Sequence, residues 1–243
     1  LSSGRFICAR CSYCQRCYLE TRCDPGFHDW NRIMSEASAV TIGILGFGAF
    51  ARLIAANLAP RFRILAHDPS EMAQAAARQS GVAVASLEEV ARSSIIVLAV
   101  PLTAFEACVS ELAGFLQPGQ IVIDVCSVKQ EPARIMQALL PPDIDILATH
   151  PMFGPESARD GVAGHRIVLC PLRGRRWRRV SAFLRLELDL EVIVASPEDH
   201  DRQAATSQGL THLLARAFDA LGAAPNIRTP SFDLLIKALD MVR

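Results

Sequence analysis

Short runs of Val, Ile and Leu recur along the chain and are separated by longer, mixed segments. Turn residues bound each run, and most runs are apolar at consecutive positions rather than at alternate ones. That pattern predicts β-strands that are buried on both faces. The predicted strands are 41–45, 62–67, 94–100, 121–125, 144–148, 166–170 and 191–195.

The segments between these runs carry hydrophobic residues at helical spacing. The predicted helices are 49–58, 70–80, 102–116, 129–140 and 175–186. A brief V-A-V-A at 82–85 predicts an additional edge strand. Strands separated by helix-length segments imply right-handed crossovers, so we expect an α/β fold with a doubly wound, mainly parallel sheet.

From Pro197 onward the pattern becomes entirely helical. Helices are predicted at 197–221 and 232–243, with Ser231 as the N-cap of the second and a polar link at 225–231 between them. Their apolar positions are too many to bury against one sheet edge, so we expect a homodimer through these helices. The apolar positions are Leu210, Leu213, Leu214, Ala217, Phe218, Leu221, Phe232, Leu235, Ile236 and Leu239.

Composition narrows the class of partner. The chain has 243 residues, 51% of them hydrophobic, and a formal net charge of zero, so bulk charge suggests neither nucleic acid nor an anionic membrane. The basic stretch 173–179 begins an amphipathic helix and is balanced by nearby acids, which favours a solvated face. No apolar run reaches the length of a membrane span. A small soluble molecule is the expected ligand.

The eight cysteines divide into two groups. Cys108, Cys126 and Cys170 lie in apolar segments, as reduced cysteines of a cytoplasmic protein do. The other five crowd the first 23 residues in a run that comes close to an iron–sulfur pattern, but its last spacing is one residue short. Because 1–38 also lacks core-forming periodicity and begins at Leu1, with Met34 as a plausible start, we predict a disordered or artefactual extension and no metal.

A glycine motif follows the first strand. The segment T-I-G-I-L-G-F-G-A-F-A ends in a glycine-rich turn, in which Gly46 permits the tight turn, Gly48 permits backbone approach to a pyrophosphate, and Ala51 permits close helix packing. Asp68 ends the second strand, where a carboxylate accepts hydrogen bonds from ribose hydroxyls. The sequence therefore predicts a dinucleotide-binding domain over 39–196.

Several residues are expected to contact the dinucleotide. They are Gly46, Phe47, Gly48, Ala49, Phe50, Asp68, Val100, Pro101 and Ser127. Because Asp68 repels a 2′-phosphate and no Arg follows it directly, NAD should be preferred and NADP remains possible. A role for Asp68 limited to capping the next helix is the competing interpretation.

Ligands bind at the carboxyl ends of strands in an open parallel sheet, so the residues after each strand are informative. The segment D-V-C-S-V-K follows the fourth main strand, and T-H-P-M-F-G-P-E-S follows the fifth and opens a long loop led by a histidine. A third segment, H-D-R-Q-A-A-T-S-Q-G-L-T-H, lies on the helix after the sheet.

These three motifs, in this order behind G-F-G-A-F-A, resemble the prephenate/arogenate dehydrogenase family of tyrosine biosynthesis over about residues 39 to 243. The resemblance implies a Rossmann-type nucleotide domain followed by an all-helical substrate and dimerisation domain, of which 197–243 is a part that appears cut short. It also implies NAD(P)-dependent oxidation and decarboxylation of prephenate or arogenate.

The resemblance also implies residue roles. His150 accepts the substrate hydroxyl proton, Ser127 orients His150 and the nicotinamide, and His212 lines the substrate pocket. Lys129 could add positive potential near the substrate carboxylates, or be solvated in the first turn of its helix. Ser127 could instead be a plain helix N-cap, and His200 is expected to cap its helix or to support the site indirectly.

Two other functions remain open. One is another Rossmann reductase that acts on a hydroxy acid or an imine, although such enzymes lack the H-P-M-F-G-P-E loop beside S-V-K. The other is a truncated, weakly active protein that binds nucleotide, or a metal through its N-terminal cysteines, and serves as an interaction module. Substrate-dependent reduction of NAD or NADP by the purified chain separates the three.

Overall fold

The computed structural model describes residues 40–222 and 225–240. The predicted extension 1–38, with its cysteine cluster and Met34, lies outside the described residues. Within the described part, no group of three or more His, Cys, Asp or Glu side chains is arranged to hold a metal. Nor does any described helix combine the length and hydrophobicity needed to cross a membrane.

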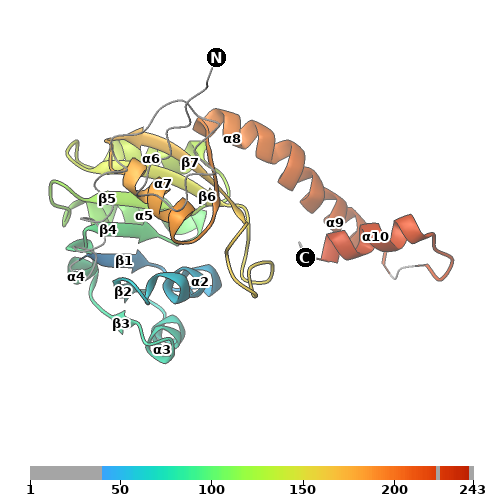
Figure 1. Cartoon of the computed structure of the whole chain (residues 1–243), viewed down its shortest axis with the longest axis horizontal. Helices are drawn as coiled ribbons and strands as arrows, with labels where there is room; N and C mark the ends of the chain where they lie inside the picture. Colours follow the sequence, from blue (N-terminus) through green and yellow to red (C-terminus); the bar gives the residue numbers. More distant parts are fainter. Residues whose placement is uncertain (1–39, 223–224, 241–243) are drawn as a thin grey trace, which may run out of the picture. The chain divides into compact units, whose positions relative to one another are not determined.

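Eight strands form one sheet in the order β3-β2-β1-β4-β5-β6-β7-β8 (Figure 1). Every neighbouring pair is parallel except β6 and β7, which are antiparallel. The predicted, mainly parallel sheet is therefore confirmed. The strands are β1 (Thr41–Leu45), β2 (Arg63–His67), β3 (Ala83–Val84), β4 (Ile95–Leu98), β5 (Ile121–Asp124), β6 (Asp145–Pro151), β7 (Arg166–Arg173) and β8 (Glu191–Val194).

Helices cover both faces of this sheet. They are α2 (Ala49–Leu58), α3 (Glu71–Gln79), α4 (Leu87–Ala91), α5 (Leu102–Ala113), α6 (Gln130–Leu139) and α7 (Trp177–Leu186). The short helix α4 was not predicted, although a capping box marks its start: Ser86 Oγ accepts from Glu89 N–H, and the Glu89 carboxylate accepts from Ser86 N–H.

Consecutive residues of one strand pack into hydrophobic clusters on opposite faces of the sheet. On β1, Ile44 packs with residues of α2 and α3, whereas Leu45 packs with residues of α4, α5 and α6. A third cluster joins Leu147 of β6 and Leu169 of β7 to α7. The central strands β1, β4, β5 and β6 are buried on both faces, as their continuous hydrophobic runs predicted, whereas β8 is largely exposed. The carboxyl ends of the central strands therefore form a rigid platform for side chains.

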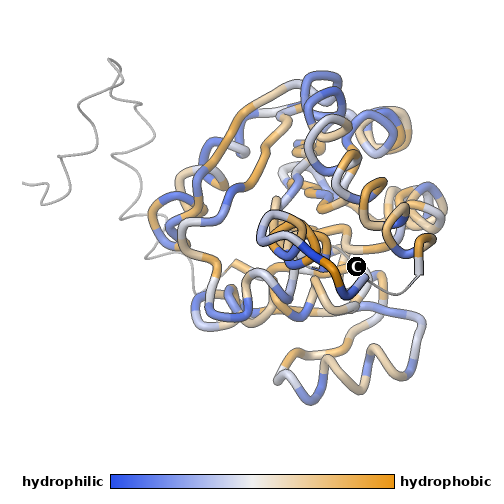
Figure 2. Tube along the Cα trace, turned by 90° about the vertical axis from the view of Figure 1, so that its right-hand side faces the viewer, coloured by the Kyte–Doolittle hydropathy of each residue, from blue (hydrophilic) through white to orange (hydrophobic). Residues whose placement is uncertain are grey.

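The helical part begins with α8 (Pro197–Ala204), which runs through a π-helical turn (Ala205–Gly209) into α9 (Leu210–Ala220), and ends with α10 (Pro230–Asp240). The rings of Phe218 and Phe232 lie 5.8 Å apart and pack α9 against α10. Figure 2 shows hydrophobic and hydrophilic residues interleaved along the helices next to the C-terminus. Several of the hydrophobic side chains are exposed.

The start of α10 corrects one expectation. The helix begins at Pro230, and Thr229 Oγ1 accepts a hydrogen bond from Phe232 N–H at 3.3 Å. Thr229 therefore caps the helix in place of Ser231, since a proline at the first helical position lacks only an N–H that the helix would not use.

Candidate functional site: a nucleotide cleft beside a buried histidine pair

The glycine-rich turn opens a cleft at the carboxyl ends of β1 and β4. Gly46 has φ +84°, and a Cβ atom there would lie 2.6 Å from the carbonyl oxygen of Ala99, so no other residue fits. A Cβ atom on Gly48, by contrast, would meet no atom within 4 Å. Gly48 is also the N-cap of α2, whose first N–H groups are suited to an anion.

Asp68 ties this turn to the end of β2. Its Oδ2 accepts a hydrogen bond from Phe47 N–H at 2.7 Å, and its Oδ1 accepts one from Ser70 N–H at 2.8 Å. The N-cap of α3 is Ser70, so Asp68 does more than cap the next helix. It holds the glycine turn in place and lines the cleft at the same time.

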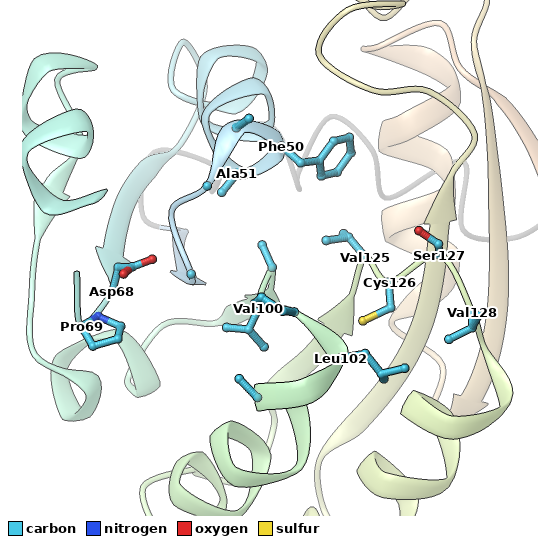
Figure 3. Close-up of a pocket in the computed structure, with 16 residues that line it drawn as sticks. Phe50, Ala51, Asp68, Pro69, Val100, Leu102, Val125, Cys126, Ser127 and Val128 are labelled. Atoms are coloured by element: carbon cyan, nitrogen blue, oxygen red, sulfur yellow. The ribbon is translucent and has the colours of Figure 1, made fainter. Parts of the chain in front are cut away.

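The cleft has a volume of 770 Å³. In Figure 3, Asp68 and Pro69 lie on one side of it and Ser127 and Val128 on the other, with Val100 between them. Of the residues expected to contact a dinucleotide, all but Phe47 line the cleft, and Phe47 is buried and contributes its N–H to Asp68. The cleft-lining members are Gly46, Gly48, Ala49, Phe50, Asp68, Val100, Pro101 and Ser127.

Ser127 presents a hydroxyl to this cleft. Its alternative role as a plain N-cap is wrong, because the N-cap of α6 is Lys129 and the first N–H groups of that helix bond to Asp201. Among the described residues, the Ser127 side chain makes no hydrogen bond within the protein. The exposed hydroxyl is therefore available to a ligand.

His150 lies on β6, the strand next to β5. The sequence placed it at the head of a loop, but β6 extends to Pro151 and pairs His150 with Val168 of β7. The parallel register of β5 and β6 aligns Asp124 with Ala148, so Ser127 and His150 both follow that point at the same edge of the sheet. His150 is not among the cleft-lining residues; it lies beside the cleft and is only 4% exposed.

His200 of α8 is the direct partner of His150. The His150 Nδ1 and His200 Nε2 atoms are 2.8 Å apart, and the rings meet edge to face with centroids 5.0 Å apart. His200 Nδ1 in turn lies 2.8 Å from Asp201 Oδ1. His200 does not cap α8, because the N-cap of that helix is Ser196; its side chain contacts His150 directly instead.

Burial is the main cause of an unusually low pKa of the His150 side chain. It lowers the pKa of His150 from 6.5 to about 4, with further electrostatic lowering from its neighbours His200 and Lys129 and an opposing effect of Asp201. His150 is therefore neutral at pH 7, and within the described part of the chain no hydrogen bond engages its Nε2. A neutral imidazole with a free nitrogen can accept a proton.

Lys129 corrects another expectation. Its side chain is fully buried, and its ammonium donates to Asp124 Oδ2 and to the carbonyl oxygen of Thr149. It is neither solvated nor able to touch a ligand that enters from solvent. Lys129 instead joins the ends of β5 and β6, directly before His150.

Asp124 completes this junction. Its Oδ1 accepts from Thr149 N–H and its Oδ2 from Cys126 N–H, while its carbonyl oxygen accepts from the Thr149 hydroxyl. Burial raises the pKa of the Asp124 carboxyl, and the Lys129 ammonium and the backbone donors oppose that rise. With so many bonds, the junction fixes the backbone on which His150 is mounted.

Asp201 is the site residue to which the sequence interpretation gave no role. It accepts hydrogen bonds from Lys129 N–H at 2.7 Å and Gln130 N–H at 2.9 Å, as well as facing His200. Burial acts to raise its pKa, but these bonds and the interaction with His200 prevail and lower it. The only signal in the sequence was the acid directly after a histidine at a helix start.

Two further sequence motifs, His212 on α9 and the segment that follows His150, lie outside the cleft lining. His212 lies on α9 with an exposed side chain and does not line the cleft. In the segment between β6 and β7, the ring centroid of Phe153 lies 6.1 Å from that of Phe50, which lines the cleft. The histidine-led segment therefore contacts the first turn of the nucleotide helix α2.

Fold and cleft together define a nucleotide-binding α/β domain with a buried histidine at the carboxyl edge of its sheet. Residues 50–194 match the family model described as prephenate dehydrogenase, nucleotide-binding domain. The match covers more than half of the chain, so the chain belongs to the prephenate dehydrogenase family.

Known relatives agree with this assignment. The chain is 29% identical to arogenate dehydrogenase 1, chloroplastic, of Arabidopsis thaliana over 85% of its own length and 34% of that protein. It is 28% identical to arogenate dehydrogenase 2, chloroplastic, of the same plant over 84% of its length and 60% of that protein. The chain therefore spans less than two thirds of either relative.

A solved structure matches the fold. Prephenate dehydrogenase from A. aeolicus, in complex with hydroxyphenyl propionate and NAD+, superimposes with a TM-score of 0.68 at 19% identity. The match covers 82% of this chain and 77% of the A. aeolicus chain. It extends beyond the length of the nucleotide domain alone and supports the Rossmann-type fold with following helices.

Proposed function

We propose that this chain carries the nucleotide-binding and proton-accepting parts of a dehydrogenase that converts prephenate to 4-hydroxyphenylpyruvate, or arogenate to tyrosine, in tyrosine biosynthesis. One observation carries the proposal beyond family membership. His150 is neutral at pH 7, and among the described residues its Nε2 makes no hydrogen bond. His150 lies one strand away from Ser127, which lines a cleft that suits a dinucleotide.

The cleft fits the cofactor by its own geometry. Open space in front of Gly48 would admit a phosphate to the N-terminus of α2, and Asp68, which lines the cleft, would accept hydrogen bonds from the adenosine ribose. Bound NAD would supply the hydride acceptor for the ring C4 hydrogen. Ser127, at the other side of the cleft, would orient both the nicotinamide and the substrate hydroxyl.

The protein's part in the reaction is proton transfer and orientation. His150 Nε2 accepts the C4 hydroxyl proton while the C4–H electron pair leaves as hydride, so a carbonyl forms at C4. The ring carboxylate then leaves as CO2; its bonding electrons complete the aromatic ring and the C4 oxygen takes up a proton. Because aromatisation makes the step irreversible, the site needs to orient the substrate rather than to stabilise the product.

Of the two residues expected to contact the substrate, only His212 is retained in this proposal. His212 would line the substrate pocket from α9, where its exposed side chain is free to meet a ligand. Lys129 is reassigned to holding β5 and β6 together. NAD would be preferred over NADP because the Asp68 carboxylate repels a 2′-phosphate.

A homodimer through α9 and α10 belongs to the same proposal. Leu213, Leu221 and Leu234 are 65%, 79% and 68% exposed, which is unfavourable for a helix pair left in water. Light scattering at micromolar concentration should give twice the chain mass, and a strictly monomeric, folded chain would contradict the dimer.

A cytoplasmic location also stays a prediction. It rests on the unpaired thiols of Cys108, Cys126 and Cys170. One relative is named chloroplastic, so imaging of the tagged protein in its own cells is the direct test.

The test of function is an assay of the purified chain with prephenate and with arogenate, each with NAD and with NADP. Substrate-dependent production of reduced nucleotide with release of CO2 is expected. Nucleotide binding without turnover of either substrate would leave the cleft assigned and would contradict the reaction.

A further inference from the structure

The proposed base and two further side chains form a line. His150 on β6, His200 on α8 and Asp201 on α8 are joined by two contacts of 2.8 Å each. Both histidines are 4% exposed, so water cannot replace either partner freely. Such a line restricts where the protons on the two rings can be.

The order of donors and acceptors starts from Asp201. Its carboxylate has no hydrogen to give, because it already accepts two backbone N–H bonds from the start of α6, which favour its charged form. His200 Nδ1 must therefore carry a hydrogen. With one hydrogen on the ring, His200 Nε2 holds a lone pair, so the hydrogen between the two rings belongs to His150 Nδ1.

We propose that His200, oriented by Asp201, is a positioning residue that fixes His150 as the Nδ1–H tautomer and so leaves its Nε2 lone pair as the proton acceptor. The catalytic consequence rests on the function proposed above, but the tautomer does not. In the opposite tautomer, Nε2 would carry a hydrogen and His150 could not accept a proton there.

The hydrogen bonds to His200 and Asp201 also stabilise the charged state of His150. When Nε2 takes the substrate hydroxyl proton, the imidazolium keeps Nδ1–H and donates it to His200, whose own Nδ1–H faces the negative Asp201. The positive charge is stabilised through two hydrogen bonds, and no second proton needs to move. The step adds one proton to His150 and removes one from the substrate.

Asp201 also makes this arrangement depend on the docking of α8. Its hydrogen bonds to Lys129 N–H and Gln130 N–H attach the start of α8 to the start of α6. The protonation pattern of a strand residue is thus set by a helix that follows the nucleotide domain in the chain.

Nitrogen NMR tests the tautomer without any enzymatic turnover. The protein has six histidines, and ¹⁵N-histidine labelling reports which ring nitrogen of each carries hydrogen. The His150→Asn variant identifies the His150 signals. We expect hydrogen on Nδ1 of His150 and none on Nε2 at pH 7. Hydrogen on Nε2, or a doubly protonated His200 that donates to both neighbours, would overturn the proposal.

Variants of His200 test the consequence. His200→Leu removes the acceptor, so kcat should fall roughly 10²-fold while KM and nucleotide affinity stay unchanged. His200→Gln places a carbonyl oxygen near the position of Nε2 and should keep kcat within roughly fivefold of the original. Equal losses in both variants, or no loss in His200→Leu, would argue against positioning.

A control separates positioning from damage to α8. Ser196 Oγ accepts from Asp199 N–H at the start of the same helix and does not touch His150. Ser196→Ala should lower the melting temperature without changing the His150 nitrogen signals. If the original protein turns over neither substrate, the proposed reaction fails, and the NMR result still decides the tautomer.

Discussion

The nucleotide cleft differs from the line formed by His150, His200 and Asp201 in how far apart in the sequence its interacting residues lie. In the cleft, the bond between Phe47 and Asp68 joins residues 21 apart. Around the base, the contact between His150 and His200 spans 50 residues, and that between Lys129 and Asp201 spans 72. The glycine turn and Asp68 thus lie within one βαβ unit, and the segments after β4 and β5 supply the rest of the cleft lining. The base, by contrast, depends on the docking of a distant helix.

Substitution of the base should have the largest effect on turnover and little on the cleft. His150→Asn keeps a side chain of similar size but removes the proton acceptor, so kcat should fall by roughly 10²- to 10⁴-fold. Nucleotide affinity, measured by fluorescence or calorimetry, should barely change. His165→Asn is the matched control, since that ring packs beside Phe153. Retention of most turnover in His150→Asn would make His150 structural.

Breaking the buried ion pair should affect stability more than any cleft substitution. Lys129→Met leaves the Asp124 carboxylate buried without its cation, which should lower the free energy of unfolding by about 3–5 kcal/mol. The measurement is urea denaturation followed by circular dichroism. The double variant Asp124→Asn/Lys129→Met should regain part of the loss. A single variant as stable as the original protein would show that the pair is dispensable.

A substitution in the cleft should change cofactor choice and leave the base intact. Asp68→Ser removes the negative charge that repels a 2′-phosphate, so the NAD-to-NADP ratio of kcat/KM should fall about tenfold, the size expected for one charged hydrogen bond. Glu71→Ser changes an exposed acid near the same turn and controls for general charge. Catalytic efficiency with NADP equal to that with NAD in the original protein would contradict the preference.

The low pKa of His150 should contribute to the pH dependence of stability. Between pH 6.5 and about 4, the unfolded chain binds a proton at His150 that the folded protein does not. The contribution of His150 to the free energy of unfolding should therefore fall as the pH decreases through that interval, and this contribution should be constant above it. His150→Asn should remove this part of the slope, as chemical denaturation at several pH values can measure. An identical slope in both proteins would mean that His150 titrates normally when folded.

Local patterns were enough to predict the sheet and the cleft. Gly46, Gly48 and Asp68 each have a role that follows from backbone geometry within one strand–helix–strand unit. Continuous apolar runs identified the strands because burial on both faces leaves little room for polar residues. The helix α4 was missed because it has only five residues, too few to show a period.

The base and its supports could not be predicted in the same way. The role of Lys129 was mistaken because a lysine in a first helical turn is ordinarily solvated, and only the packed structure reveals Asp124 and the Thr149 carbonyl beside it. Asp201 was overlooked because its partners lie far away in the chain. The sequence motifs pointed to His150, but long-range packing determined which groups lie beside it.

The π-helical turn at Ala205–Gly209 has a geometric consequence for the residues on either side of it. His212 follows His200 by twelve positions, and in an unbroken α-helix the two side chains would point about 120° apart around the axis. One extra residue accommodated in the turn reduces that angle to about 20°. Because of this extra residue, His212 projects from nearly the same side of the continuous helix as His200.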